Sequence, residues 1–246
     1  MVTLATLQTA IEYQCQDNLN LYDSPDLKSL ATQAIAGRQL RIVSSPAAAA
    51  VAVQLCEDDY PGWVAIEDLD LIEPAAESYA AIALDEAEIA ARLPQVIAYA
   101  EAAMRQPNHY LWGGTIGPNY DCSGLMQAAF LAAGIWLPRD AYQQADFAQR
   151  IDRADLRSGD LVFFASGDRI THVGLYLVAD QYIHSSGKDQ GRNGIAIDLL
   201  SESTDAIGQA YFRQFHSAGR IVASYQPMRD RQKPPSGSCA NETASL

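Results

Sequence analysis

The sequence predicts an α+β protein with two domains, and three observations lead to this prediction. Residues 1–75 contain several short apolar stretches separated by turn residues, a pattern typical of a small β-barrel. Residues 85–105 carry apolar side chains at helical spacing. Beyond residue 107, one nearly apolar helical stretch precedes a series of strand-like stretches, which indicates a helix packed on an antiparallel sheet.

The first 75 residues are expected to form the barrel. Residues 9–15 partly alternate, which places Ile11, Tyr13 and Cys15 on one face of a strand. Free cysteines usually fill cores, so Cys15 and Cys56 are interpreted as core residues. The other strands of the barrel are predicted at residues 19–22, 39–43 and 50–55, and residues 58–66 are read as a turn leading into a further strand.

Residues 76–106 are expected to link the two domains through a helix. Apolar residues such as Ile89, Val96 and Ala100 recur at helical spacing in this segment. Pro94 lies inside the pattern. Because proline lacks an N–H group and clashes with the preceding turn, it should kink this helix or split it in two.

Residues 107–228 form the second domain in this prediction. Its first helix, over residues 125–133, ends at Gly134. Strands are expected at residues 161–164, 170–178, 182–185, 194–199 and 221–225, the last of which closes the sheet. Residues 229–246, which include Cys239, have the composition of a flexible tail.

Composition limits the classes of partner and the compartment. The net charge of −13 argues against a nucleic acid or an anionic membrane surface as a partner. The N-terminal residues show neither a basic segment nor a long apolar run, so no secretory signal and no membrane span are expected. Four cysteines are too few and too scattered for a disulfide scaffold, which favours a cytoplasmic location.

Asp121-Cys122-Ser123-Gly124 lies between a glycine-rich loop, residues 112–120, and the apolar helix. Asp121 or Ser123 can cap the start of this helix. Unpaired N–H groups and the positive end of the helix dipole favour a thiolate at Cys122. From this stretch alone, the alternative that Cys122 is a small buried hydrophobe is equally plausible.

Two of the four histidines favour catalysis at Cys122. His172 lies within the strand at residues 170–178, and Gly174 beside it suggests close packing at that point. His184 lies in the next strand, so pairing about a turn near residues 178–181 would bring the two rings together. A thiol, a base and a group that orients the base are the set that nucleophilic catalysis needs. The same three side chains could also bind a metal ion, but no fourth ligand is evident and no metal is expected.

Several motifs resemble the NlpC family of papain-like cell-wall cysteine peptidases, and together they cover most of residues 107–200. In addition, Tyr60-Pro61-Gly62-Trp63-Val64 is similar to bacterial SH3-like domains. The resemblance implies a papain-like catalytic domain of the NlpC type, in which a helix packs on an antiparallel sheet. An SH3-like barrel would precede this domain in the sequence. The motifs are Tyr110-Leu111-Trp112-Gly113-Gly114, Asp121-Cys122-Ser123-Gly124, Ser158-Gly159-Asp160-Leu161-Val162-Phe163-Phe164, His172-Val173-Gly174-Leu175-Tyr176 and His184-Ser185.

The resemblance also implies the roles of individual residues. Cys122 would be the nucleophile, His172 the base, and His184 the residue that orients the base. Tyr110 would help to hold the oxyanion together with the backbone N–H of Cys122. A free substrate amine would be bound by four residues: Asp121, Ser123, Tyr60 and Asp23. Ala141 departs from the family pattern, because many such enzymes carry a serine there.

The function implied by this resemblance is that of a cysteine endopeptidase without a cofactor. It would cleave the γ-D-glutamyl-L-diamino acid bond of a peptidoglycan stem peptide, L-Ala-γ-D-Glu-diaminopimelate, during murein peptide recycling in the cytoplasm. Three alternatives remain open: remodelling of intact peptidoglycan, transpeptidation or amidase chemistry, and an inactive wall-binding module. The last would require a missing motif residue, and none is missing. The sequence carries no indication of the oligomeric state.

Overall fold

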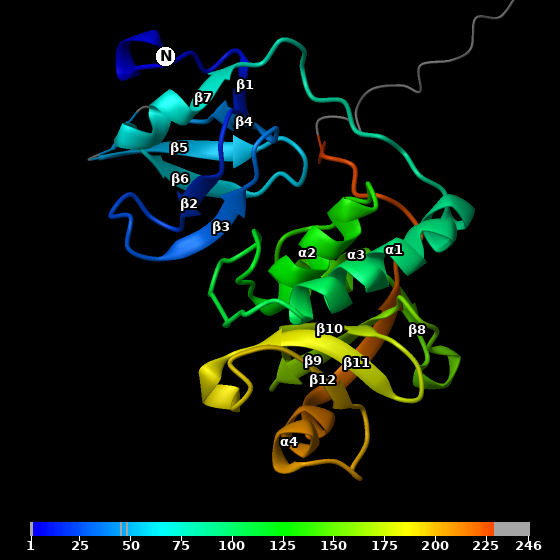
Figure 1. Cartoon of the computed structure of the whole chain (residues 1–246). Coiled ribbons are helices and arrows are strands. Elements are labelled where there is room, and N and C mark those ends of the chain that lie inside the picture. The colour runs from blue at the N-terminus through cyan, green and yellow to red at the C-terminus, as the bar shows by residue number, and fades with distance from the viewer. Residues whose placement is uncertain (1, 45, 48, 229–246) are drawn as a thin grey trace, which may run out of the picture.

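A computed structural model describes residues 2–44, 46–47 and 49–228. It shows two domains, with the N-terminal domain resting against one side of the larger C-terminal domain (Figure 1). The tail predicted at residues 229–246, with Cys239, lies outside the described residues.

The N-terminal domain is built on one seven-stranded antiparallel sheet with the order β3-β2-β6-β5-β4-β1-β7. Its strands are β1 (Glu12–Cys15), β2 (Leu19–Tyr22), β3 (Leu30–Ala34), β4 (Gln39–Ile42), β5 (Ala50–Leu55), β6 (Pro61–Ala65) and β7 (Ile72–Pro74), and two short 3-10 helices are η1 (Leu4–Thr6) and η2 (Ile66–Leu71). Tyr13, Cys15 and Leu21 belong to its buried apolar core, and Cys56 is also buried. The predicted strands are confirmed, whereas β3 and β7 were not predicted because they hold few large apolar residues.

The C-terminal domain is a six-stranded antiparallel sheet with helices on both faces (Figure 1). The sheet order is β12-β11-β10-β9-β13-β8. The strands are β8 (Gln149–Ile151), β9 (Leu161–Ser166), β10 (Arg169–Tyr176), β11 (Gln181–Ser186), β12 (Gly194–Leu199) and β13 (Phe215–Arg220), and the helices are α1 (Glu86–Met104), α2 (Cys122–Ala132), α3 (Ala141–Phe147) and α4 (Ala206–Gln214), with 3-10 turns η3 (Arg153–Asp155) and η4 (Lys188–Gln190). Helix α2 packs on β10 and β11, while α4 contacts β9 and β12 and packs over Phe164 and Tyr182 on the opposite face.

Helix α1 differs from the prediction in two respects. It runs without a break through Pro94, which is exposed, so the helix is not split in two at this residue. Its buried face, with Ile89 and Val96, belongs to the same core as α2. The predicted linker at residues 76–106 therefore contains a helix that is part of the C-terminal domain.

The predicted strand at residues 221–225 is also wrong. The sheet instead gains β13, which pairs with β9 and β8. Residues 221–225 have a different role: the Ser224 hydroxyl accepts a hydrogen bond from the backbone N–H of Trp136, and the backbone N–H of Tyr225 donates to the Trp136 carbonyl. Their apolar character reflects this packing, since Ile221 is buried.

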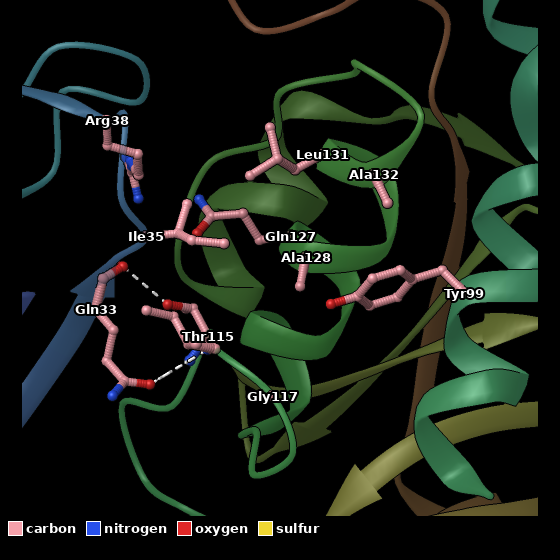
Figure 2. Close-up of a pocket in the computed structure, with 11 residues that line it drawn as sticks. Gln33, Ile35, Arg38, Tyr99, Thr115, Gly117, Gln127, Ala128, Leu131 and Ala132 are labelled. Atoms are coloured by element: carbon pink, nitrogen blue, oxygen red, sulfur yellow. Dashed lines mark hydrogen bonds between the residues drawn. The ribbon is translucent and has the colours of Figure 1, made fainter. Parts of the chain in front are cut away.

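Hydrogen bonds fasten the barrel to the loop that precedes Cys122. The Gln33 side-chain oxygen accepts from the backbone N–H groups of Thr115 and Ile116, and the Thr115 hydroxyl donates to the Gln33 carbonyl (Figure 2). Gln127 of α2 donates to the buried Asp58 carboxylate of the barrel. The cavity in Figure 2 lies at this junction, between barrel residues and α2 residues.

Two glycines in this fold offer a matched test of close packing. Gly124 and Gly208 each follow an aspartate cap by three residues and donate their N–H to it. A Cβ at Gly124 would lie 2.0 Å from the Gly114 carbonyl oxygen, whereas one at Gly208 would meet only the Thr204 side chain.

We therefore expect Gly124→Ala to lower the free energy of unfolding by about 1–3 kcal/mol, because backbone must move. Gly208→Ala should cost less, since the Thr204 side chain rather than backbone must shift and alanine favours helix. Urea denaturation of both variants measures this. Equal effects of the two substitutions would contradict the predicted clash at Gly124.

Candidate active site

Cys122 is the first residue of α2, and the sequence places it there for a physical reason. Asp121 adopts an extended conformation and its carboxylate accepts a 2.7 Å hydrogen bond from the backbone N–H of Gly124, so it caps the helix as predicted. Cys122 is only 6% exposed. It nevertheless lines a cleft of about 450 Å³ between the two domains, which gives its sulfur a route to a ligand.

The two predicted histidines meet on neighbouring strands. Nε2 of His172 on β10 lies 2.7 Å from Nδ1 of His184 on β11. Gly174 allows this approach, because a Cβ there would lie 2.7 Å from the Tyr182 ring and 3.3 Å from the His184 Cβ. The close packing expected at Gly174 is therefore confirmed.

Cys122 also lies beside β10. The backbone N–H of Val173, the residue after His172, forms a hydrogen bond to the cysteine thiol that lowers its pKa, as does that of Ser123. The thiol and the base thus come from adjacent positions in the fold, one at a helix tip and one on the strand that the helix covers.

Burial decides the protonation of this pair. It raises the pKa of the Cys122 thiol to about 12, with a further contribution from the Asp121 charge, and outweighs the N–H groups at the helix start. Burial, assisted by His184, also lowers the pKa of His172 well below its ordinary value. Burial therefore opposes the thiolate that the helix start favours.

Asp121 and Ser123 have an internal partner that the sequence did not indicate. Two nitrogens of the buried Arg139 guanidinium bind the Asp121 carboxylate at 2.6 and 3.1 Å, and one of them also binds the Ser123 hydroxyl at 3.0 Å. The backbone N–H of Gly113 donates to the same carboxylate. The charge of Asp121 is thus already neutralised, although Asp121 and Ser123 both line the cleft.

The remaining predicted residues also line the cleft. Tyr110 lies near Cys122, and burial followed by the cysteine charge raises the pKa of its phenol. Tyr60 and Asp23 reach the cleft from the barrel, and the Tyr60 hydroxyl donates to the Asp140 carboxylate at 3.2 Å. Their roles stay predictions. Ala141, the position that departs from the family pattern, lies in the same wall.

Besides Arg139, sequence reasoning missed three charged residues in and around the cleft. Asp198 binds His184 at 2.9 Å, and its signal was a lone acidic residue in an otherwise apolar strand. Asp140 and Arg169 line the cleft, but neither occupies a position that spacing could single out. Their placement depends on how the α2–α3 connection and the β9–β10 turn fold.

Among residues 2–44, 46–47 and 49–228, no group of three or more His, Cys, Asp or Glu side chains is arranged to hold a metal ion. Within the same ranges, none of the helices has the length and apolar character needed to cross a membrane.

Family models identify both domains. Residues 107–215 match the NlpC/P60 family, and residues 21–69 match the bacterial dipeptidyl-peptidase SH3 domain. The chain therefore carries an NlpC/P60 domain of the α+β class behind an N-terminal bacterial SH3 domain, which confirms the predicted family and fold.

Two curated proteins and one solved structure are similar to parts of this chain. The gamma-D-glutamyl-L-lysine dipeptidyl-peptidase of Bacillus subtilis (strain 168) is 40% identical over 37% of this chain and 30% of its own length. The murein DD-endopeptidase MepS/murein LD-carboxypeptidase of Escherichia coli (strain K12) is 36% identical over 47% of this chain and 56% of its own. An NlpC/P60 family protein from Bacillus cereus ATCC 10987 aligns with a TM-score of 0.47 and 21% identity, over 86% of this chain and 64% of that one. The chain thus spans less than two thirds of each of these proteins.

The buried histidines predict how stability depends on pH. Burial lowers the pKa of His172 and of His184, so the unfolded chain binds protons below about pH 6.5 that the folded protein resists. The free energy of unfolding should therefore be fully present above about pH 6.5 and fall as the pH is lowered toward about 5.

Urea denaturation across this range measures the effect, with the double variant His172→Gln/His184→Gln as the reference because it lacks both groups. The wild type should lose more stability than the double variant. Parallel losses in the two proteins would show that these histidines do not resist protonation.

Proposed function

We propose that this protein is a cysteine endopeptidase that cleaves the γ-D-glutamyl-L-diamino acid bond of peptidoglycan stem peptides with a free N-terminal L-alanine. Two observations carry the proposal: Cys122 lines a cleft that barrel residues also line, and the His172–His184 pair lies on β10 and β11, the strands that α2 contacts. The name of the Bacillus subtilis relative, a gamma-D-glutamyl-L-lysine dipeptidyl-peptidase, supports the same bond type.

In the first half of the proposed reaction, the Cys122 sulfur attacks the γ-carbonyl carbon of D-glutamate. The thiol proton passes to His172 as the S–C bond forms, because burial raises the pKa of the thiol and disfavours the free thiolate before attack. The nitrogen that accepts it is Nδ1, since Nε2 is engaged with His184. The oxyanion is held by the backbone N–H of Cys122 and by the Tyr110 hydroxyl.

In the second half, the tetrahedral intermediate collapses and the C–N bond breaks. The leaving diamino acid takes the proton from His172 as its amine departs, and a γ-D-glutamyl thioester remains on Cys122. Water then attacks the thioester carbon and gives a proton to His172, which returns it to the sulfur. The dipeptide leaves with a free γ-carboxylate.

The acidic wall of the cleft supports recognition of a free amine. Asp140 faces the cleft with Tyr60 as its hydrogen-bond donor, and Asp23 adds a second carboxylate from the barrel. Since Arg139 already neutralises Asp121, we propose that Asp140 supplies the main negative charge for the substrate ammonium, with Asp121 and Ser123 shaping the pocket.

A requirement for this amine favours released peptides over the intact wall, where the stem peptide is joined through its first residue. We therefore propose that the protein acts in cytoplasmic recycling of murein peptides. Hydrolysis of intact peptidoglycan is the alternative. The name of the MepS relative, a murein DD-endopeptidase, supports this alternative.

The role of Cys122 is tested by Cys122→Ala, with Cys15→Ala as the control because Cys15 is a buried cysteine of the barrel core. Cys122→Ala should lower kcat for L-Ala-γ-D-Glu-diaminopimelate by at least about 10³-fold without unfolding the protein. Chromatographic detection of released diaminopimelate gives the rate. Comparable turnover by the two variants would exclude Cys122 as the nucleophile.

Substrate choice is tested by comparing three substrates: the free tripeptide, its N-acetylated form and intact sacculi. Acetylation removes the ammonium and leaves Asp140 without its ligand, so kcat/KM should fall by at least about 10²-fold. Release of peptides from sacculi should be slower still. A preference for sacculi would overturn the recycling proposal, and indifference to acetylation would overturn the role of the amine.

A further inference from the structure

We propose that Asp198 is a positioning residue that sets which nitrogen of His172 carries the proton, acting through His184. This inference rests on the proposed function, since it concerns the same base. It adds a carboxylate to the predicted set of Cys122, His172 and His184, and it follows from the hydrogen-bonding capacity of each group.

The fold brings Asp198 to His184 through strand register. On the antiparallel pair β11–β12, His184 lies opposite Ala196 and Asp198 opposite Tyr182, so His184 and Asp198 are diagonal neighbours on one face. Oδ2 of Asp198 lies 2.9 Å from Nε2 of His184. Both side chains are buried, so water does not compete for this hydrogen bond.

Asp198 is held as a carboxylate. Although burial opposes ionisation, hydrogen bonds from His184 and Arg192 outweigh it and lower the pKa of Asp198 to about 2. Arg192 binds Asp198 and also Asp205, the N-cap of α4, at 2.8 Å. An ionised carboxylate only accepts hydrogen bonds, so Nε2 of His184 must carry a proton.

The proton positions on His184 and His172 follow from this in turn. A neutral imidazole has one N–H, so Nδ1 of His184 is an acceptor once Nε2 is protonated. The 2.7 Å contact between the rings therefore requires a proton on Nε2 of His172. This leaves Nδ1 of His172 unprotonated, which is the state that a base for the Cys122 thiol needs.

Arg192 connects the Asp198–His184–His172 series of hydrogen bonds to helix α4. Because it binds the cap of α4, it ties Asp198 to the helix that carries Tyr211. The Tyr211 ring lies 4.7 Å from the His172 ring at an interplanar angle of 30°. Arg192 thus holds Asp198, the hydrogen-bond acceptor of His184, and also holds the helix whose Tyr211 ring packs on His172.

Asp198→Asn tests the inference because it keeps the shape and reverses the hydrogen bond. The asparagine amide can donate to Nε2 of His184, which moves the His184 proton to Nδ1 and the His172 proton from Nε2 to Nδ1, facing the thiol. We expect kcat for the tripeptide to fall by about 10²–10⁴-fold with KM little changed, as an Asp→Asn change in a serine-protease triad costs about 10⁴.

The readout specific to positioning is the ¹⁵N NMR spectrum of the imidazoles. The chain has only four histidines, and His109→Gln and His216→Gln assign the two outside the site. At about pH 7, wild-type His172 should be protonated on Nε2, and the Asp198→Asn variant on Nδ1. Wild-type His172 protonated on Nδ1 would overturn the proposal, whether or not the variant folds.

Asp160→Asn is the matched control, because Asp160, directly before β9, is equally buried and bound by Arg220, but has no hydrogen bond to a histidine. It should leave kcat and the histidine spectrum unchanged even if it lowers stability. An equal loss of kcat in the two variants would reduce Asp198 to a structural role. Absence of tripeptide cleavage by the wild type would instead overturn the proposed function. The ¹⁵N NMR spectrum would still test the predicted tautomer of His172.

Discussion

A buried ion pair, Asp121–Arg139, holds the parts of the site together. The Asp121 carboxylate caps the helix that begins with Cys122 and accepts a hydrogen bond from the Gly113 backbone in the preceding loop. Arg139 binds that carboxylate, and its Nε also donates to the Thr32 hydroxyl of the barrel at 2.9 Å. Breaking a buried pair by removing one partner costs about 3–5 kcal/mol, so this pair contributes strongly to the coupling of helix, loop and barrel.

Burial also sets the electrostatics of the nucleophile. A helix N-terminus favours an anion by roughly 0.3–1 kcal/mol, whereas desolvation of a buried charge costs several kcal/mol. Desolvation therefore prevails at Cys122, whose pKa is raised to about 12. Burial likewise lowers the pKa of His172, so both shifts favour the neutral forms of the thiol and the imidazole.

The sequence allowed prediction of the features that depend on local chemistry. The barrel strands, the helix capped by Asp121 and the approach of His184 to His172 all followed from periodicity, turn residues and short strand connections. Longer-range packing could not be predicted in this way. Pro94 lies inside an unbroken helix, and residues 221–225 bond to the Trp136 backbone instead of pairing as a strand. Arg139 was missed because helix α2 and the segment that follows it separate Arg139 from Asp121. The path of that segment is not encoded locally in the sequence.

The contact between Arg139 and Thr32 has a consequence for how such two-domain proteins diversify. A domain that merely delivers an enzyme to its target can be exchanged without altering the chemistry. This barrel supplies part of the cleft wall and touches the residue that steadies the nucleophile's helix. Replacing it with another module would therefore reshape selectivity and reactivity together, so evolution is expected to have retained the two domains as one inherited unit.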